Sequence, residues 1–268
     1  MNGLVHVEDV MGTAVVLDLR WRAGHEPDGV EDALVDAVQV LHDVDLVFST
    51  WRPDSSVSRL RRAETGLQSC PPEVREVVLL CVRAMRLSAG WFDPWRQPGG
   101  FDPTGLVKGW AAKRAAARLS AAGITDHCVN AGGDVCVTGS GEPDEPDSWT
   151  VGITDPEEPS RLLTVVTVRG GGVATSGGYE RGPLAVDPFT GVPVERLLSA
   201  TVVGPDLAIA DALATAATAA GPDARDWLEA APGYEALLVV PGGGVLVTSG
   251  WPGPTAGLPL ERQLVSAR

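Results

Sequence analysis

The spacing of hydrophobic residues predicts that helices dominate the first half of the chain. Residues 13–22 alternate between apolar and polar positions, which is typical of a strand. Over residues 30–44 the apolar positions recur every three or four residues and predict an amphipathic helix. Residues 72–90 and 106–123 predict two more helices, each closed by a glycine, and the first of them begins with a proline. The stretch 45–60, rich in Ser and Pro after an apolar start, is expected to be a loop.

Strand patterns gather in the second half. Strands are expected at 128–138, 149–154 and 162–168, followed by a glycine-rich connection at 169–182. An alanine-rich helix, a short helix near 223–229 and a strand hairpin over 236–250 complete the body. This order predicts a single domain of the α/β or α+β class spanning residues 1–268, with a loose tail from about residue 252.

The alanine-rich stretch "PDLAIADALATAATAAG" carries an unusual pair of polar residues. Asp211 lies in the middle of a helix pattern, although aspartate favours helix caps. Thr215 follows four residues later and therefore shares its helix face. One interpretation is structural: Asp211 caps a helix that starts late, and Thr215 bonds back to its own turn. The other is a site for a hard divalent cation such as Mg²⁺, completed by a backbone carbonyl and phosphate oxygens.

Composition excludes several classes of function. The formal net charge of −14 argues against broad nucleic-acid binding and against an anionic membrane surface, because both need a surplus of Lys and Arg. The four cysteines show no CxxC spacing and are expected to be buried, reduced thiols. The N-terminus shows no secretory signal, and no apolar run reaches the roughly 20 residues that span a bilayer. A soluble, cytoplasmic protein is expected.

Two Asp-Pro pairs, at 93–94 and 102–103, each follow a phenylalanine. Either pair alone would be read as an Asx turn, but the second leads through Thr-Gly directly into a helix. Gly105 allows a partner to approach the backbone closely. Lys108 lies in the first turn of that helix, where a cation opposes the helix dipole, so we expect it to meet an anion beside the free backbone N–H groups.

Two further glycine pairs give weaker indications of a binding site than the Asp-Pro segments do. "VNAGGDVCVTG" places Gly132 and Gly133 inside a strand pattern, which indicates a bulge or a close approach of ligand. "VATSGGYERG" offers Thr175 and Ser176 beside glycines, a composition that suits phosphate contact. Ser176 is not in a GxSxG elbow, so a hydrolase triad has little support.

Taken in order, eight segments resemble one family, the FAD:protein FMN transferases or ApbE family. They are "MGTAVVLDL", "VFSTWRPDSSVSRL", "GWFDP", "FDPTGLVKGWAAKRAAARL", "VNAGGDVCVTG", "VATSGGYERG", "DPFTG" and "LLSATVVGPDLAIADALATAATAAG", within about residues 7–221. The resemblance implies a fold related to the T-fold, with a mixed sheet and flanking helices. It also implies that the protein binds FAD and Mg²⁺, moves FMN onto a Thr or Ser hydroxyl of an acceptor flavoprotein, and releases AMP.

The resemblance also assigns residues. It implies a metal site made by the Gly105 carbonyl oxygen, Asp211 and Thr215. Positions that would contact FAD are Met11, Trp51, Trp91, Phe92, Asp93, Asp102, Lys108 and Ala185. Lys108 would also stabilise the charge that grows on the phosphates as the pyrophosphate breaks.

The chain departs from the family in the stretch "LAVDPFTG". The family commonly has histidine at the position of Leu184 and arginine at the position of Phe189. Asp187 could serve as the base in place of that histidine, or could cap a turn. Gly178 stands where an acidic or amide side chain is common, and the segment between "GWFDP" and "FDPTG" is short. A protein that binds or stores FAD without transfer, and a metal-dependent FAD pyrophosphatase giving FMN and AMP, therefore remain alternatives.

Overall fold

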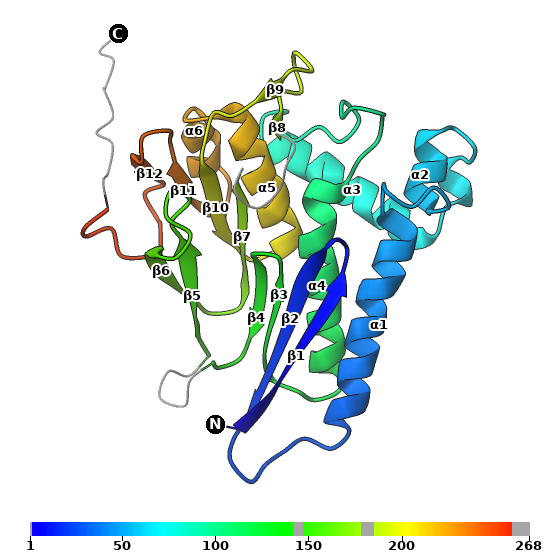
Figure 1. Cartoon of the computed structure of the whole chain (residues 1–268), viewed down its shortest axis with the longest axis vertical. Helices are drawn as coiled ribbons and strands as arrows, with labels where there is room; N and C mark the ends of the chain where they lie inside the picture. The colour runs from blue at the N-terminus through cyan, green and yellow to red at the C-terminus, as the bar shows by residue number, and fades with distance from the viewer. Residues whose placement is uncertain (1, 142–146, 178–184, 259–268) are drawn as a thin grey trace.

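An eight-stranded sheet forms the framework of the protein (Figure 1). The computed structural model describes residues 2–141, 147–177 and 185–258. The strand order is β1-β2-β3-β4-β7-β10-β11-β12. The strands are β1 (Asn2–Val10), β2 (Thr13–Trp21), β3 (Asp126–Ala131), β4 (Asp134–Thr138), β7 (Gly171–Gly177), β10 (Ser199–Gly204), β11 (Glu235–Val239) and β12 (Val245–Val247).

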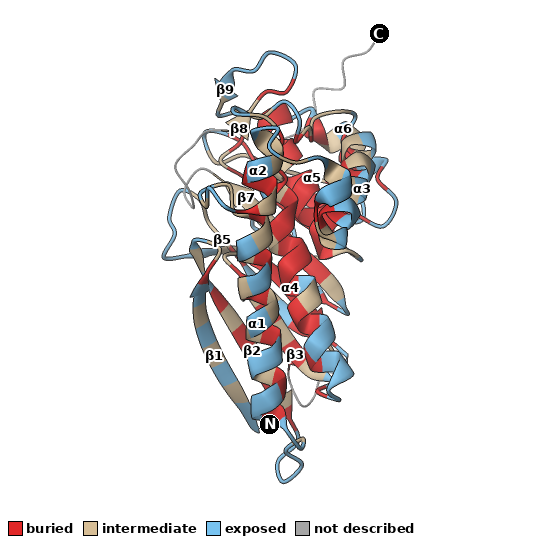
Figure 2. Cartoon of the chain, turned by 90° about the vertical axis from the view of Figure 1, so that its right-hand side faces the viewer, coloured by how far each residue is buried: buried red, intermediate tan, exposed pale blue. Residues whose placement is uncertain are grey.

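Helices cover one face of this sheet. Contacts join α4 to β3 and β4, and α5 to β7 and β10, while α1 packs outside α4. Figure 2 shows the result: α4 and α5 are largely buried, whereas α1 exposes its outer side. The helices are α1 (Val30–Phe48), α2 (Ser56–Arg61), a short 3₁₀ turn η1 (Leu67–Ser69), α3 (Pro72–Leu87), α4 (Thr104–Ala121), α5 (Leu207–Ala220) and α6 (Ala224–Glu229).

The opposite face carries a separate hairpin of β5 (Trp149–Thr154) and β6 (Leu162–Val168). Its inward side chains, including Trp149 and Val166, form a second apolar cluster with Val137 and Val173 of the sheet. A third small sheet pairs β8 (Ala185–Val186) with β9 (Pro193–Val194). The α+β class expected from the sequence is confirmed.

The sheet itself is antiparallel rather than mixed. Every strand pair found among the described residues is antiparallel. Short turns join β1 to β2, β3 to β4 and β11 to β12, and a short turn can connect only antiparallel neighbours. The expectation of a mixed sheet is therefore wrong in this detail.

Several expected elements also differ from the structure. The single strand expected at 128–138 is a hairpin, because Gly132 (φ 60°) and Gly133 (φ 93°) adopt the left-handed backbone of a tight turn. The loop expected at 45–60 contains the last turn of α1 and five of the six residues of α2, where the Ser55 side chain accepts a hydrogen bond from the Ser58 amide. Strands β1 and β10 were not expected.

The glycine-rich connection expected at 169–182 is in fact a central strand, β7, up to Gly177. A Cβ on Gly171 would lie 2.5 Å from the Gly204 carbonyl oxygen, and one on Gly172 would lie 2.7 Å from the Leu207 side chain. These glycines allow neighbouring chain segments to pack closely against the strand, so they do not mark a loop. Residues 178–182 of the expected connection lie outside the described residues.

The ends of the chain add two points. Thr164 Oγ1 of β6 donates a hydrogen bond to the Pro254 carbonyl oxygen (3.1 Å), so residues near 254 lie against the hairpin. The rest of the expected tail, residues 259–268, lies outside the described part of the chain. Among the described residues, no helix combines the length and the apolar character that crossing a membrane requires.

Candidate functional site

Helices α4 and α5 cross at close range where two glycines lie one turn apart. A Cβ on Gly109 would lie 2.6 Å from the Leu207 carbonyl oxygen and 3.0 Å from the Asp211 Cβ. A Cβ on Gly105 would lie 3.0 Å from the Thr215 Cγ2. The spacing Gly105-x-x-x-Gly109 therefore brings the backbone of α4 against the polar pair on α5.

This crossing brings together the two helix segments that carry the three oxygen groups implied by the family resemblance, those of Gly105, Asp211 and Thr215. Asp211 is 1% exposed, and its Oδ2 accepts a hydrogen bond from the Gly109 amide at 3.0 Å. The Thr215 hydroxyl donates to the Gly105 carbonyl oxygen at 3.3 Å, and Ser176 Oγ of β7 lies 3.3 Å from the same hydroxyl.

The structural interpretation of the pair does not hold. Helix α5 begins at Leu207, and Asp206 caps it by accepting from the Ala208 amide at 3.1 Å. Asp211 is therefore in the second turn and caps nothing. Thr215 points its hydroxyl at α4 and does not bond back to its own turn.

Lys108 lies beside this crossing and points toward the sheet. Its Nζ forms an ion pair with Oδ2 of Asp134, a fully buried residue at the start of β4. The described anionic partner of Lys108 is thus a carboxylate of the chain itself. A buried carboxylate is stable only when its charge is compensated, and Lys108 provides that compensation.

The run Trp91-Phe92-Asp93 is held at the end of α3. Ser88 accepts from the Trp91 amide through its carbonyl oxygen (3.0 Å) and from the Phe92 amide through its side chain (2.9 Å). The Phe92 ring is buried against Gly105, so this run adjoins the oxygen donors.

Both Asp-Pro pairs form Asx turns. Asp93 accepts from the Trp95 amide at 2.9 Å, and Asp102 accepts from the Thr104 amide at 3.0 Å. The short segment between them closes into a compact loop, because the Asp102 amide donates to the Pro94 carbonyl oxygen at 2.8 Å.

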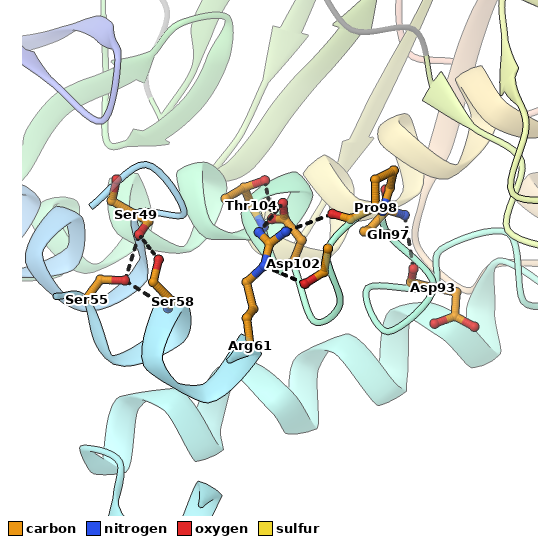
Figure 3. A network of polar contacts seen from close by, with 10 residues as sticks. Ser49, Ser55, Ser58, Arg61, Asp93, Gln97, Pro98, Asp102 and Thr104 are labelled. Atoms are coloured by element: carbon orange, nitrogen blue, oxygen red, sulfur yellow. Dashed lines mark hydrogen bonds and ion pairs between the residues drawn. The ribbon is translucent and has the colours of Figure 1, made fainter. Parts of the chain in front are cut away.

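Arg61 of α2 anchors that loop from the side (Figure 3). Its guanidinium donates to the carbonyl oxygens of Pro98 (2.8 Å) and Gly99 (3.1 Å), and to Oδ2 of Asp102 (3.2 Å). The position of Asp102 at the start of α4 therefore depends on α2, the helix that the sequence pattern did not predict.

Asp187 occupies the turn between β8 and β9. Its Oδ1 accepts from the amides of Phe189 (2.8 Å) and Thr190 (3.2 Å), and its Oδ2 pairs with Arg196 at 2.7 Å. Burial acts to raise the pKa of the Asp187 carboxyl. The hydrogen bonds from the Phe189 amide and the Arg196 guanidinium outweigh burial, so the pKa lies below its ordinary value. This environment favours a turn cap over a proton acceptor.

Phe189 lies edge-on to Trp91, with ring centroids 4.9 Å apart and planes at 84°. Arg196 places its Cζ 5.3 Å from the Trp91 ring centroid. The turn between β8 and β9 is thereby joined to the loop that follows α3. Ala185 opens β8, which contacts α5.

Two predicted residues have no described contact with the others. Met11 lies in the turn between β1 and β2 with a left-handed backbone (φ 55°) and packs against the main core. Trp51, in the loop after α1, is 94% exposed. Leu184 and Gly178, where the chain departs from the family, lie outside the described residues.

The sequence did not reveal the partners that hold these residues in place. Gly109 could have been found from its spacing to Gly105. Arg61 and Arg196 had no local signal, because each acts on segments distant in the sequence. All four cysteines are free, as expected, and burial raises the pKa of the Cys81 thiol to about 12.

Comparison with known proteins decides the family. The model of the ApbE family matches residues 11–100 and 95–238, which together make up most of the chain. The chain belongs to the ApbE family. The two matched pieces overlap at residues 95–100, which lie between the two Asp-Pro pairs.

Relatives within the ApbE family share a name. The FAD:protein FMN transferase of Rhodobacter capsulatus is 37% identical over 147 residues, which cover 51% of this chain and 27% of that protein. The protein of the same name from Escherichia coli K12 is 32% identical over 132 residues, covering 46% and 37%. The chain thus spans less than half the length of these curated relatives.

Solved structures of the ApbE family share the fold. The ApbE protein of Thermotoga maritima superimposes with a TM-score of 0.79 at 22% identity, covering 93% of this chain and 98% of that one. The flavin transferase ApbE of Vibrio cholerae gives 0.76 at 19% identity. At these identities the likeness establishes the architecture and leaves the chemistry to the site itself.

Proposed function

We propose that this chain is an FAD:protein FMN transferase, which moves the FMN part of FAD onto a Thr or Ser hydroxyl of an acceptor flavoprotein and releases AMP. The observation that carries the proposal is the cluster of Gly105, Asp211 and Thr215 oxygens at the crossing of α4 and α5. Family membership supports it, since relatives carry the same name.

The oxygen cluster fits a hard divalent cation. It offers one carboxylate, one hydroxyl and one backbone carbonyl, the donor types that Mg²⁺ accepts. Asp211 is buried with one described hydrogen bond, from a neutral amide, so its charge is not compensated by any cation among the described residues. The described residues contain no group of three or more His, Cys, Asp or Glu suited to a metal. Substrate oxygens or water would have to complete the coordination, as is usual for Mg²⁺.

The reaction joins an acceptor hydroxyl oxygen to the FMN-side phosphorus and breaks the bond from that phosphorus to the bridging oxygen, which leaves with AMP. A cation bound to the cluster would offset charge on the phosphate oxygens. Lys108, paired with Asp134, would contact the same anion from the sheet side. The proposed lining of the FAD site consists of seven further residues: Met11, Trp51, Trp91, Phe92, Asp93, Asp102 and Ala185.

Asp187 was one candidate for the base that takes the hydroxyl proton. Both of its oxygens already accept hydrogen bonds, and its pKa is lowered. We therefore propose that Asp187 shapes the turn after β8. The proton of the attacking hydroxyl would then pass to a base other than Asp187.

The test is incubation of the protein with FAD, Mg²⁺ and a candidate acceptor flavoprotein, with EDTA as the control for metal dependence. We expect AMP release together with flavin fluorescence on the acceptor in a denaturing gel. AMP with free FMN would indicate a pyrophosphatase instead. FAD retained without AMP would indicate a storage protein. Either result would overturn the transferase assignment.

A further inference from the structure

The side chain of Arg196 joins three segments that are distant in the sequence. It follows β9, and its Nη2 donates to Oδ2 of Asp187 in the turn between β8 and β9 (2.7 Å). Its Nη1 donates to the carbonyl oxygen of Ala219 in the last turn of α5 (2.7 Å). Its Cζ lies 5.3 Å from the ring centroid of Trp91, after α3.

The contact with Ala219 satisfies the C-terminal end of α5. The last carbonyl groups of a helix lack partners within it, and α5 has no basic residue in its last turn. Arg196 supplies the missing donor and the positive charge. Room for it exists because Gly221 has no side chain: a Cβ there would lie 2.9 Å from the Arg196 Cβ.

The three segments that Arg196 joins are walls of the proposed site. The turn follows Ala185 directly, Trp91 opens the run Trp91-Phe92-Asp93, and Ala219 lies one helical turn beyond Thr215. A guanidinium is suited to this task, since its planar fork can donate in two directions while it lies against an aromatic ring.

Phe189, in the turn between β8 and β9, packs edge-on to Trp91. Arg196, seven residues further on, brings a guanidinium to the same turn and to the same ring.

We propose that Arg196 is a positioning residue, which holds Trp91 and the turn after β8 against the end of α5 and so shapes the part of the site that receives FAD. This inference rests on the proposed function. Arg196 itself touches no reacting atom. A purely structural role is the competing explanation, but the Arg196 side chain is 37% exposed, and partly exposed ion pairs add little to stability.

The test compares Arg196→Gln and Arg196→Lys with the wild-type protein. FAD affinity is measured in Mg²⁺ from the quenching of flavin fluorescence, and the melting temperature is recorded for each variant. We expect Arg196→Gln to raise the Kd for FAD about tenfold, because a charge-assisted hydrogen bond and the contact with Trp91 are both lost. Arg196→Lys keeps the positive charge beside Asp187, so its Kd for FAD should lie between those of the wild type and Arg196→Gln.

Arg225→Gln is the matched control. Arg225 also links two elements, since its Nε donates to the Val247 carbonyl oxygen (2.7 Å) and its Nη2 lies 4.0 Å from Glu229. It joins α6 to β12, and we expect a comparable loss in melting temperature with an unchanged Kd for FAD. An equal rise in Kd for both glutamine variants would show a general effect of stability and would overturn the proposal.

A double-mutant cycle with Asp187→Asn adds a second readout. If Arg196 acts through the turn, the double variant should bind FAD no more weakly than Arg196→Gln alone. Additive losses would mean that the two residues act separately, and the proposal would fail.

Wild-type protein that did not bind FAD would overturn both the function and this inference. Wild-type binding with an unaffected Arg196→Gln variant would overturn the inference alone. Should Arg196→Gln not fold, Arg196→Lys carries the same comparison.

Discussion

At the residue scale, the proposed site contains a buried carboxylate that forms no ion pair with any of the described residues. Asp211 is 1% exposed, and the described side chain has one hydrogen bond, from the Gly109 amide. By contrast, the buried Asp134 is paired with Lys108. An uncompensated charge inside a protein is costly, so an evolved chain keeps one where a ligand supplies the compensation. This contrast between two aspartates is the physical reason for placing the cation at Asp211.

Asp211→Asn tests that assignment with little change of shape. The asparagine can still accept from the Gly109 amide, but it removes the negative charge from the cluster. We expect AMP release to fall by at least about 100-fold, the loss typical of a removed electrostatic contact in a transition state. The measurement is AMP release as a function of Mg²⁺ concentration.

Asp206→Asn provides the control for Asp211→Asn, because Asp206 is an aspartate of the same helix that caps its start and pairs with Lys113. It should retain AMP release. Unchanged Mg²⁺ dependence in Asp211→Asn would remove Asp211 from the metal site.

Trp51 shows the opposite situation, a large apolar side chain left in solvent. At 94% exposure it contributes little to folding, so Trp51→Ala should change the free energy of unfolding by no more than about 0.5 kcal/mol. If its ring stacks on FAD, the same substitution should weaken FAD binding about tenfold or more. Isothermal titration with FAD and thermal melting separate the two effects. Full FAD affinity in Trp51→Ala would remove this residue from the proposed site.

At the scale of elements, the contact between α4 and α5 also builds the oxygen cluster. Gly105 and Gly109 let α4 approach α5 until Thr215 and Asp211 meet its backbone. Twelve residues of α5 are buried and eight of them are alanines, so most of the buried side chains of this helix are small. The alanine-rich sequence is thus explained by packing, and the polar pair lies where this packing places the proposed site.

Gly109→Ala should disturb both packing and function. The added Cβ would lie 2.6 Å from the Leu207 carbonyl oxygen, so α4 and α5 must separate. We expect a loss of about 1–3 kcal/mol in the free energy of unfolding, as for other overpacked cores. Urea unfolding and AMP release are the measurements.

Ala117→Gly, on the exposed side of the same helix, is the comparison for Gly109→Ala. It should lose only about 1 kcal/mol from helix propensity and keep its activity. A Gly109→Ala variant with full stability and activity would show that the close contact of Gly109 with α5 is needed for neither property.

The longer helices α1, α3 and α4 could be predicted because each has a repeating apolar pattern or clear end signals. α3, with Pro72 in its first turn and Gly90 beyond its end, was expected within three residues of its observed bounds. β7 could not be recognised, since its glycines are required by neighbouring segments that only the folded structure brings together. Likewise α2 was not recognised, because its residues lie in a stretch rich in Ser and Pro that favours a loop.

The candidate site likewise contains residues that could be predicted from the sequence and contacts that could not. Gly105, Lys108, Asp211 and Thr215 lie within two short motifs, and their spacing alone indicated a shared face or turn. The contacts of Arg61 with Pro98, and of Arg196 with Ala219, join residues separated by 37 and 23 positions. No local pattern encodes such pairings, because they depend on how whole elements pack.

At the scale of the whole molecule, stability should depend on one buried histidine. His127 on β3 is fully buried, with Nε2 2.9 Å from Ser120 Oγ of α4. Its Nδ1 has no hydrogen-bond partner among the described residues. Burial lowers the pKa of His127 to about 4, although the nearby charge of Asp126 acts in the opposite direction. The folded protein therefore keeps this imidazole neutral at pH values where an unfolded chain would protonate it.

The sign of the pH effect follows from linkage. Below about pH 6.5 the unfolded chain binds a proton at His127, and the folded chain does not bind it until the pH approaches about 4. Stability from this group is therefore complete above pH 6.5 and is lost as the pH falls through that interval. Between pH 7.5 and pH 5 the free energy of unfolding should drop by about 2 kcal/mol on this account.

Urea unfolding of the wild-type protein and of His127→Phe at both pH values isolates this contribution. Phenylalanine keeps a flat ring in the core and cannot titrate, while the carboxylates that also titrate are common to both proteins. We expect the pH-dependent loss to be about 2 kcal/mol smaller in the variant. His25→Gln, at an exposed histidine, should behave like the wild type because its imidazole is in solvent in both states. Equal pH dependence in wild type and His127→Phe would mean that the imidazole is protonated inside the fold, and that β3 and α4 tolerate a charge between them.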